Sequence, residues 1–241
     1  MAASARPQKP ALTSIVLPIH NQAGHVEHVV HAYLDALDPL ELKFEILLVT
    51  NACRDESPAA CDRLAASDAR VKHVPIDTAG WGAAVRAGLA EAKGDLLCYT
   101  NSARTTPQIL TLLLVYATVY PEVVLKANRR IRDSRRRRLG SLLYNLECRA
   151  LFDLPVWDVN GTPKIFPRSF DRLLRLERDD DLVDIEFVSV CRSADYPIIE
   201  VPILATVRYG GRSTTGYGSA LRMYLGAYRL WRAQRSAVDG A

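Results

Sequence analysis

The chain has 241 residues, of which 49% are hydrophobic and 24% are charged. This length and apolar content allow one substantial buried core within the size range of a single α/β domain, so we expect one domain. The five cysteines form no C-x-x-C pair, and their odd number argues against a complete disulfide framework. We therefore expect a protein of the reducing cytoplasm.

No segment of the sequence has the pattern of a membrane span. The longest apolar stretch, residues 109–125, is interrupted by a tyrosine, a proline and a glutamate, which favours a buried helix followed by a strand. Residues 1–12 contain basic residues with no apolar segment after them, so we expect a disordered lead without a secretory signal. Peripheral contact with a membrane surface stays open.

The net charge is only +4, but residues 129–138 hold seven arginines in ten positions. A run this dense indicates either an anionic partner or a solvated surface. Residues 135–138 stay open between anionic lipid, an acceptor phosphate and solvent. Nucleic acid would need an aromatic or recognition-helix context that the sequence lacks, so we do not expect it as a partner.

The first half of the chain alternates strands with helices. Apolar runs predict strands at residues 14–18, 44–49, 71–76, 95–99 and 123–126, and helical periodicity predicts helices at residues 26–37, 57–64, 83–93 and 107–119. This order implies a parallel sheet with helices on both faces. Ligands of such sheets bind beyond the carboxyl ends of the strands.

Two helix ends carry specific signals. Ser57 is expected to N-cap its helix with Pro58 at the first helical position, and Gly94 is expected to close the third helix. The later half predicts a helix at residues 140–151, strands at 162–166 and 198–207, and an acidic stretch at 179–187. No internal repeat or low-complexity linker divides the two halves.

Several motifs near these strands share the spacing of one enzyme family. Residues 80–95 match N-x-G-x-x-x-A-x-x-x-G-x-x-x-A-x-G-D, residues 158–166 echo D-x-x-S-G-F-R-x-F, and residues 195–202 match G-Y-x-I-x-E-V-P closely. Over residues 14–209 the chain resembles the inverting glycosyltransferases of family 2, which have the GT-A fold, and most closely their dolichyl-phosphate mannose synthase-like branch.

The resemblance implies a single α/β domain with a GT-A, Rossmann-like sheet that is mostly parallel and flanked by helices. We assign residues 13–210 to this domain, residues 1–12 to the lead, and residues 211–241 to a C-terminal loop and amphipathic helix. We expect that helix to pack on the domain, with dimerisation or contact with a membrane as the alternatives.

Acidic residues of the family are replaced at three strand ends. The first strand's V-P-x-Y-N-E ends in Gln22, the second strand's D-D-G-S-x-D retains only Asp55, and the fourth strand's metal-binding D-x-D reads Asn-Ser-Ala at residues 101–103. Mg²⁺ and Mn²⁺ prefer anionic oxygen ligands. We therefore expect no divalent metal at this position unless Asp55 or Asp158 reaches it, and we expect no other cofactor.

The resemblance implies a nucleotide-sugar donor bound across the strand ends. Asn51 stands at the base-recognising position, where its amide can bind a nucleobase edge or serve as a turn residue. The glycines at 80 and 82 allow either donor binding by backbone N–H groups or tight strand-to-helix packing. The candidate donor-binding residues are Pro18, His20, Asn21, Asn51, Asp55, Gly80, Gly82, Asn101 and Ser102.

Without a metal, cationic side chains or backbone N–H groups at a helix N-terminus would meet the charge of the leaving diphosphate. Guanidinium groups suit bidentate phosphate binding. The phosphate-binding candidates are Arg129 and Arg130, just after the predicted fifth strand, together with Lys164 and Arg212. The acceptor-side candidates are Asp158, Gly161 and Thr162.

Inverting transfer needs a base for a hydroxyl acceptor and none for an ionised phosphate. Asp184 and Glu186 match the family's acidic helix and are the catalytic candidates. They are two residues apart, so they do not share one helical face and at most one points into the cleft. The acids at residues 179–181 are expected to form an exposed helix start.

Histidines and cysteines give weaker signals. His25, His28 and His31 recur every third residue, but no acid or cysteine completes a metal site nearby, which favours a solvated helix face. Cys53 and Cys98 are expected to be small apolar fillers near strand ends.

The leading hypothesis is an inverting, metal-independent glycosyltransferase that moves a sugar from a nucleotide-sugar donor to a sugar, lipid-phosphate or small-molecule acceptor. The alternative is a non-catalytic relative that binds a nucleotide, sugar or partner protein as a regulator. A homodimer stays open.

Overall fold

The computed structural model describes residues 10–132, 135–205 and 217–239. Its strands are β1 (Thr13–Ile19), β2 (Phe44–Asn51), β3 (Val71–Ile76), β4 (Leu96–Tyr99), β5 (Val124–Arg132), β6 (Lys164–Pro167) and β7 (Ile198–Ala205). Its helices are α1 (Val26–Leu37), α2 (Ser57–Ser67), α3 (Trp81–Glu91), α4 (Pro107–Val119), α5 (Arg135–Phe152), α6 (Val183–Ser193) and α7 (Tyr217–Asp239), with 3₁₀ turns η1 (Asp38–Leu40) and η2 (Asp171–Leu174).

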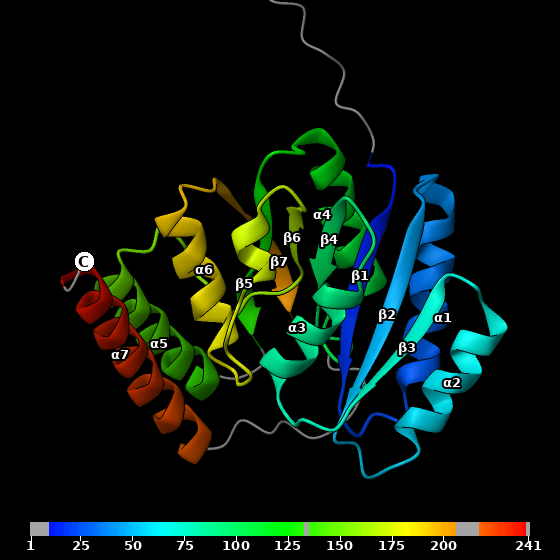
Figure 1. The fold of residues 1–241 in the computed structure, drawn as a ribbon, viewed down its shortest axis with the longest axis horizontal. Helices are drawn as coiled ribbons and strands as arrows, with labels where there is room; N and C mark the ends of the chain where they lie inside the picture. Colours follow the sequence, from blue (N-terminus) through cyan, green and yellow to red (C-terminus); the bar gives the residue numbers. More distant parts are fainter. Residues whose placement is uncertain (1–9, 133–134, 206–216, 240–241) are drawn as a thin grey trace, which may run out of the picture.

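The strands form a seven-stranded sheet in the order β3-β2-β1-β4-β6-β5-β7 (Figure 1). Strand β6 runs antiparallel to β4 and β5, and the other neighbouring pairs are parallel. The predicted mostly parallel α/β sheet with flanking helices is therefore confirmed.

Helices cover both faces of the sheet because its central strands are apolar on both sides. Successive residues of a strand point to opposite faces, so Ile15 and Leu17 pack with α1, α2 and α4, whereas Val16 packs with α3, α5 and α6. This double burial explains why β1 and β2 read as continuous apolar runs in the sequence.

Helix α3 approaches the sheet closely at Gly88. A Cβ atom there would lie 2.3 Å from Val16 Cγ1 and 2.9 Å from Val49 Cγ2. The small residues that carry the family spacing in this helix therefore have a packing role, because they set the distance between α3 and strands β1 and β2.

Two predicted helix ends are wrong. Ser57 is the first residue of α2 and not its N-cap, and its hydroxyl instead accepts the N–H of Gln22 at 2.7 Å. Helix α3 already ends at Glu91, and a Cβ on Gly94 would lie 2.7 Å from Leu12 O, so Gly94 is needed for close chain packing.

The predicted fifth strand is longer than its apolar run. Strand β5 continues through Arg132 because it pairs in parallel with β7 as far as Ala205, with one register shift between Arg129 and Ile131. Neighbouring strands supply the backbone hydrogen bonds here, whatever the polarity of the side chains.

The C-terminal helix α7 packs against α5 at one end of the sheet (Figure 1). The Tyr224 hydroxyl donates to the Gly140 carbonyl at 2.8 Å, and Ala227 and Leu230 are buried. The predicted boundaries of the lead and of the C-terminal segment stay a prediction. Among the helices of the described residues, none is both long enough and apolar enough for a membrane span.

We expect Gly88→Ala to lower the free energy of unfolding by about 1–3 kcal/mol, because the added methyl group overpacks α3 against β1. Gly140→Ala is the matched control: it lies in α5 with nothing within 4 Å of the added atom, and it should stabilise by about 0.5–1 kcal/mol. Urea unfolding followed by circular dichroism measures both. If the two substitutions changed the free energy of unfolding equally, the close contact of α3 with β1 at Gly88 would be contradicted.

Candidate functional site

The carboxyl ends of β1, β2 and β4 lie side by side, because these strands are parallel neighbours in the sheet. The loops that follow them carry most of the predicted donor-binding residues. Ligands of parallel sheets bind beyond this edge. It is therefore the candidate functional site.

Asn51 joins two of these loops to the start of α3. Its buried side-chain amide donates to Ile19 O at 2.9 Å and accepts the Gly80 N–H at 3.3 Å. Nδ1 of His20 donates to the carbonyl oxygen of Asn51 at 2.7 Å, which leaves Nε2 of the neutral ring to accept from Asn21 at 3.1 Å. In this geometry the Asn51 side chain ties the end of β1 to the start of α3, and nucleobase recognition by its amide stays a prediction.

Asn21 and Asp55 hold the first two loops together. Asn21 has a left-handed backbone, with φ of 51°, and its side-chain oxygen accepts the Arg54 N–H at 2.8 Å. The Asp55 carboxylate accepts the N–H groups of Ala23 and Ser57, each at 3.0 Å. Burial tends to raise the pKa of Asp55, but these hydrogen bonds outweigh it and the pKa lies below its ordinary value.

The segment after β4 is also bonded within the protein. Asn101 Oδ1 accepts the Ala103 N–H at 3.0 Å, and the buried Ser102 hydroxyl donates to the side-chain oxygen of Gln22. Asn101 and Ser102 thus carry neutral side chains that already have hydrogen-bond partners.

These oxygen atoms do not fit the Mg²⁺ or Mn²⁺ site of related enzymes. The two polar side chains of the 101–103 segment are neutral, and both carboxylate oxygens of Asp55 accept backbone hydrogen bonds. Within residues 10–132, 135–205 and 217–239, no group of three His, Cys, Asp or Glu side chains is arranged to hold a metal ion.

Gly80 and Gly82 allow the loop before α6 to cover the start of α3. Gly80 has φ of +148°, and a Cβ there would lie 2.1 Å from Asp179 O. A Cβ on Gly82 would lie 2.2 Å from Arg178 O, and the Ala83 N–H donates to Asp179 O at 3.0 Å. Both glycines therefore serve tight packing, and their part in donor binding stays a prediction.

A row of polar residues crosses the other half of the sheet. Tyr99 of β4 lies opposite Lys164 of β6, Lys164 lies opposite Lys126 of β5, and Lys126 lies opposite Glu200 of β7. Directly opposite residues point to the same face of a sheet. Both lysine side chains are fully buried, so each ammonium group needs an acid beside it.

Helix α6 supplies the acid for Lys164. Asp184 forms an ion pair with Lys164 and accepts the Tyr99 hydroxyl at 2.9 Å. Burial and the nearby Lys126 lower the pKa of Lys164 to about 8, against the opposing effect of Asp184. Burial, together with the Asp184 charge, raises the pKa of Tyr99.

Lys126 and Arg129 find their partners in β7 and in the segment before β6. Lys126 donates to Glu200 at 2.9 Å and to the carbonyl of Asp158. Arg129 binds the Asp158 carboxylate with two hydrogen bonds of 2.7 Å each. Burial opposes the charge of Arg129, but Asp158 outweighs it and keeps the Arg129 pKa above its ordinary value.

These contacts bear on the predicted phosphate-binding residues. Arg129 and Arg130 lie inside β5 and not after it, which corrects the predicted position. The charges of Arg129 and Lys164 are already paired within the protein. Arg130 is described only in its backbone, and Arg212 lies outside the described residues.

The two catalytic candidates point in different directions, as the spacing predicted. Asp184 is buried beside Lys164, whereas Glu186 accepts the N–H groups of Glu177 and Arg178, each at 2.9 Å. The acids at residues 179–181 are exposed as expected, but they lie in the loop before α6, which begins at Val183 with Leu182 as its N-cap.

The acceptor-side candidates lie in and near the turn that leads into β6. The Gly161 N–H donates to Asp158 O at 3.0 Å, and a Cβ on Gly161 would lie 1.8 Å from Ala127 O. Thr162 is partly buried and Pro18 is buried inside β1. Contact of these residues with donor or acceptor stays a prediction.

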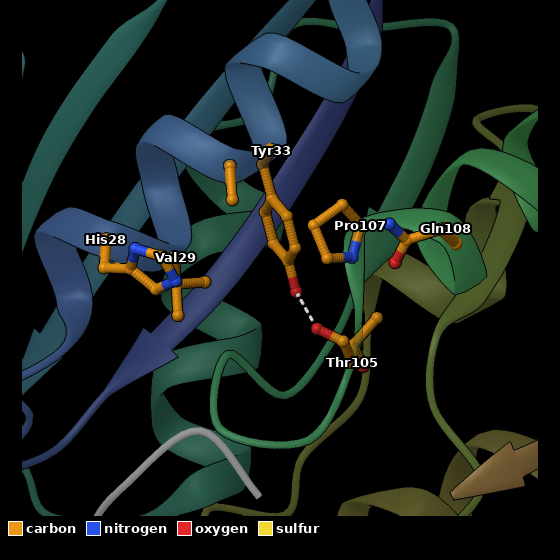
Figure 2. A pocket seen from close by; sticks show the side chains of 7 residues that line it. His28, Val29, Tyr33, Thr105, Pro107 and Gln108 are labelled. Atoms are coloured by element: carbon orange, nitrogen blue, oxygen red, sulfur yellow. Dashed lines mark hydrogen bonds between the residues drawn. The ribbon is translucent and has the colours of Figure 1, made fainter. Parts of the chain in front are cut away.

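A small cavity of about 120 Å³ lies between α1 and the start of α4 (Figure 2). The Tyr33 hydroxyl donates to Thr105 O at 2.8 Å beside it, and Pro107 and Gln108 line its far side. Ligand pockets usually enclose roughly 300–1,000 Å³. We therefore attribute to this place a packing role between α1 and the segment after β4.

The expectation of a solvated histidine face holds in part. His28 and His31 are exposed on α1, whereas His25 is the N-cap of this helix and is partly buried. Cys98 is buried, and burial raises the pKa of its thiol. Cys53 is partly buried beside Ile19 O, at 3.4 Å.

Sequence reasoning missed Tyr99, Lys126 and Glu200 as members of one network. The available signal was a charged residue inside an otherwise apolar predicted strand, as for Lys126 in residues 123–126. A charge in such a place requires a buried partner, but the sequence does not name that partner.

Comparisons with known proteins identify the family of this chain. Residues 14–174 match Glycosyl transferase family 2, and the chain belongs to this family. Glycosyltransferase AglD of Haloferax volcanii is 35% identical over 97 residues, which are 39% of this chain and 15% of that protein. An undecaprenyl-phosphate 4-deoxy-4-formamido-L-arabinose transferase of Pseudomonas fluorescens is 29% identical over 202 residues, which are 81% of this chain and 59% of that protein. The chain thus spans less than two thirds of the length of these relatives.

Solved structures show the same fold. Glucosyl-3-phosphoglycerate synthase from Mycobacterium tuberculosis, in complex with Mn²⁺, UDP and phosphoglyceric acid, aligns with a TM-score of 0.65 at 20% identity. The alignment covers 91% of this chain and 76% of that one. The GT-A class of the sheet is therefore confirmed.

We expect Lys164→Met to lower the free energy of unfolding by about 3–5 kcal/mol, because it leaves the Asp184 carboxylate buried without its cation. The double variant Lys164→Met/Asp184→Leu should recover most of this loss, since neither charge of this pair remains. Arg175→Met is the control: its pair with Asp171 is exposed, and its loss should cost less than about 1 kcal/mol. Urea unfolding measures all three, and a Lys164 effect no larger than the control would contradict the buried pair.

Proposed function

We propose that this chain is an inverting glycosyltransferase that takes its sugar from a nucleoside diphosphate sugar bound at the carboxyl ends of β1, β2 and β4. The observation that carries the proposal is family membership over residues 14–174, together with a strand-end site whose three loops are joined by hydrogen bonds through Asn51, Asp55 and Ser102. Because hydrogen bonds already hold these loops in place, they lose less conformational entropy when a donor binds.

We further propose that transfer needs no divalent metal. The loss of the D-x-D acids supports this, because the side chains at residues 101–103 offer no anionic oxygen. The partners of Asp55 support it too, since a metal would have to compete with the N–H groups of Ala23 and Ser57.

Arginine side chains would then meet the charge of the diphosphate. Arg54 is exposed on the loop after β2, whose backbone Asn21 holds in place. Arg130 and Arg212 are the other proposed phosphate ligands. Guanidinium groups bind phosphate oxygens with two parallel hydrogen bonds.

The proposed acceptor is an ionised phosphate, such as a lipid phosphate. Both predicted bases are engaged, Asp184 by Lys164 and Tyr99, and Glu186 by two backbone N–H groups. A phosphate oxyanion attacks without prior deprotonation, so it needs no base. Relatives such as the Pseudomonas fluorescens protein are named for undecaprenyl phosphate.

Donor binding is tested by thermal unfolding of the purified chain with a panel of nucleotide sugars, each in EDTA and in Mn²⁺. We expect one nucleotide sugar to raise the midpoint in EDTA, since a ligand at about 100 times its Kd stabilises the folded state by about 2.7 kcal/mol. Arg54→Gln should weaken its affinity about tenfold or more, whereas Arg63→Gln, on the exposed side of α2 and paired with Glu27, should change it less than about twofold.

A shift that appears only with Mn²⁺ would contradict metal independence. The absence of any shift, with or without metal, would contradict donor binding and favour a non-catalytic relative.

The acceptor proposal predicts that Glu186→Gln lowers kcat less than about tenfold, because loss of a true general base costs roughly 10²–10⁴-fold. Transfer to a polyprenyl phosphate from the donor identified above is the assay. A loss of about 10³-fold with unchanged donor affinity would contradict transfer to a phosphate without a general base.

A further inference from the structure

Helices α5 and α7 form a two-helix layer at one end of the sheet (Figure 1). Tyr144 and Tyr224 join them, with ring centroids 5.6 Å apart. The inner side of the layer is buried against the domain through Cys148, Ala227 and Leu230. The outer side has no partner within the described residues.

Large apolar side chains are exposed on both helices. Leu142, Leu143 and Leu146 on α5, and Leu225 and Tyr228 on α7, are each between 46% and 59% exposed. Positions 142, 143 and 146 lie on one side of a helix. Single exposed leucines are ordinary, but a group on two packed helices indicates an interaction surface.

The same layer is strongly basic. Of the 31 lysines and arginines of the chain, nine are arginines of α5 and α7, whereas these helices hold only two of its 27 acidic residues. The remainder of the chain therefore carries more acidic than basic residues. Four of the nine arginines form the first turn of α5, and Arg149 lies over the ring of the exposed Trp157, 3.9 Å from its centroid.

We propose that the outer side of the α5–α7 layer docks on the surface of an anionic bilayer. Helices that combine leucines with arginines lie in the membrane interface, with the apolar side chains among the acyl chains and the cations at the head groups. Each basic residue near an anionic surface contributes about 1 kcal/mol. A second copy of the chain at this face would bring two strongly cationic layers together, which like-charge repulsion opposes.

Helix α4 provides an internal comparison. It exposes Leu112, Val115 and Val119 on one side, but it contains no charged residue. The exposed fractions of these side chains are similar to those of the α5 leucines, but α4 has no cationic side chain beside them. The proposal assigns membrane contact to α5 and α7 and none to α4.

Cosedimentation of the full chain with vesicles tests the proposal, without donor or acceptor, so its outcome is independent of the proposed transfer reaction. We expect binding to vesicles of phosphatidylcholine with phosphatidylglycerol, weakened by added salt, and little binding to phosphatidylcholine alone. Leu142→Ser/Leu143→Ser/Leu146→Ser should lower the partition coefficient about tenfold or more. Gln at all four of residues 135–138 should lower it as well.

The control is Leu112→Ser/Val115→Ser/Val119→Ser, which should bind as the unchanged chain does. Thermal unfolding verifies that each variant is folded, which is expected of the leucine and valine variants because their replaced side chains are about half exposed. Three results would each overturn the proposal: no binding to anionic vesicles, an equal loss in the α4 variant, or a dimer in solution that the α5 variant abolishes.

Discussion

The second half of this fold depends on buried charge pairing. Lys126 and Lys164 lie opposite each other on β5 and β6, with no access to solvent. Two adjacent ammonium groups are stable in such a place only when acids reach them. Asp184 comes from α6 and Glu200 from β7, so those elements must be in place before the centre of the sheet is neutral. The register of β5 with β6 and β7 and the position of α6 therefore depend on one another.

The strand-end site is built differently, mainly from neutral groups. Asn51 and Ser102 connect the loops through amide and hydroxyl hydrogen bonds, and Asp55 connects them through backbone N–H groups. The loops at this edge are thus joined by hydrogen bonds within the protein. The sheet behind them depends on close packing at places such as Gly88.

The arginine run of residues 129–138 is divided between two environments. Arg129 is paired inside the protein with Asp158. Residues 135–138 instead form the first turn of α5, which packs against the basic and partly apolar helix α7. Arg129 thus balances a buried carboxylate beside the sheet, and residues 135–138 add positive charge to the α5–α7 layer. Strand β5 extends along β7 as far as Arg132, and α5 begins at Arg135.

The sequence by itself determined the order of strands and helices, the close packing of α3 and the neutral side chains at residues 101–103. These features are local: strand and helix periods, glycine spacing and the identity of a few side chains are all present in short segments. Only the tertiary structure decided how far β5 extends, which side of α6 Asp184 faces, and that Arg129 and Lys164 are paired inside the protein. Their partners, Asp158 and Asp184, lie 29 and 20 residues away along the chain. Such pairing depends on how the segments pack, which local patterns do not specify.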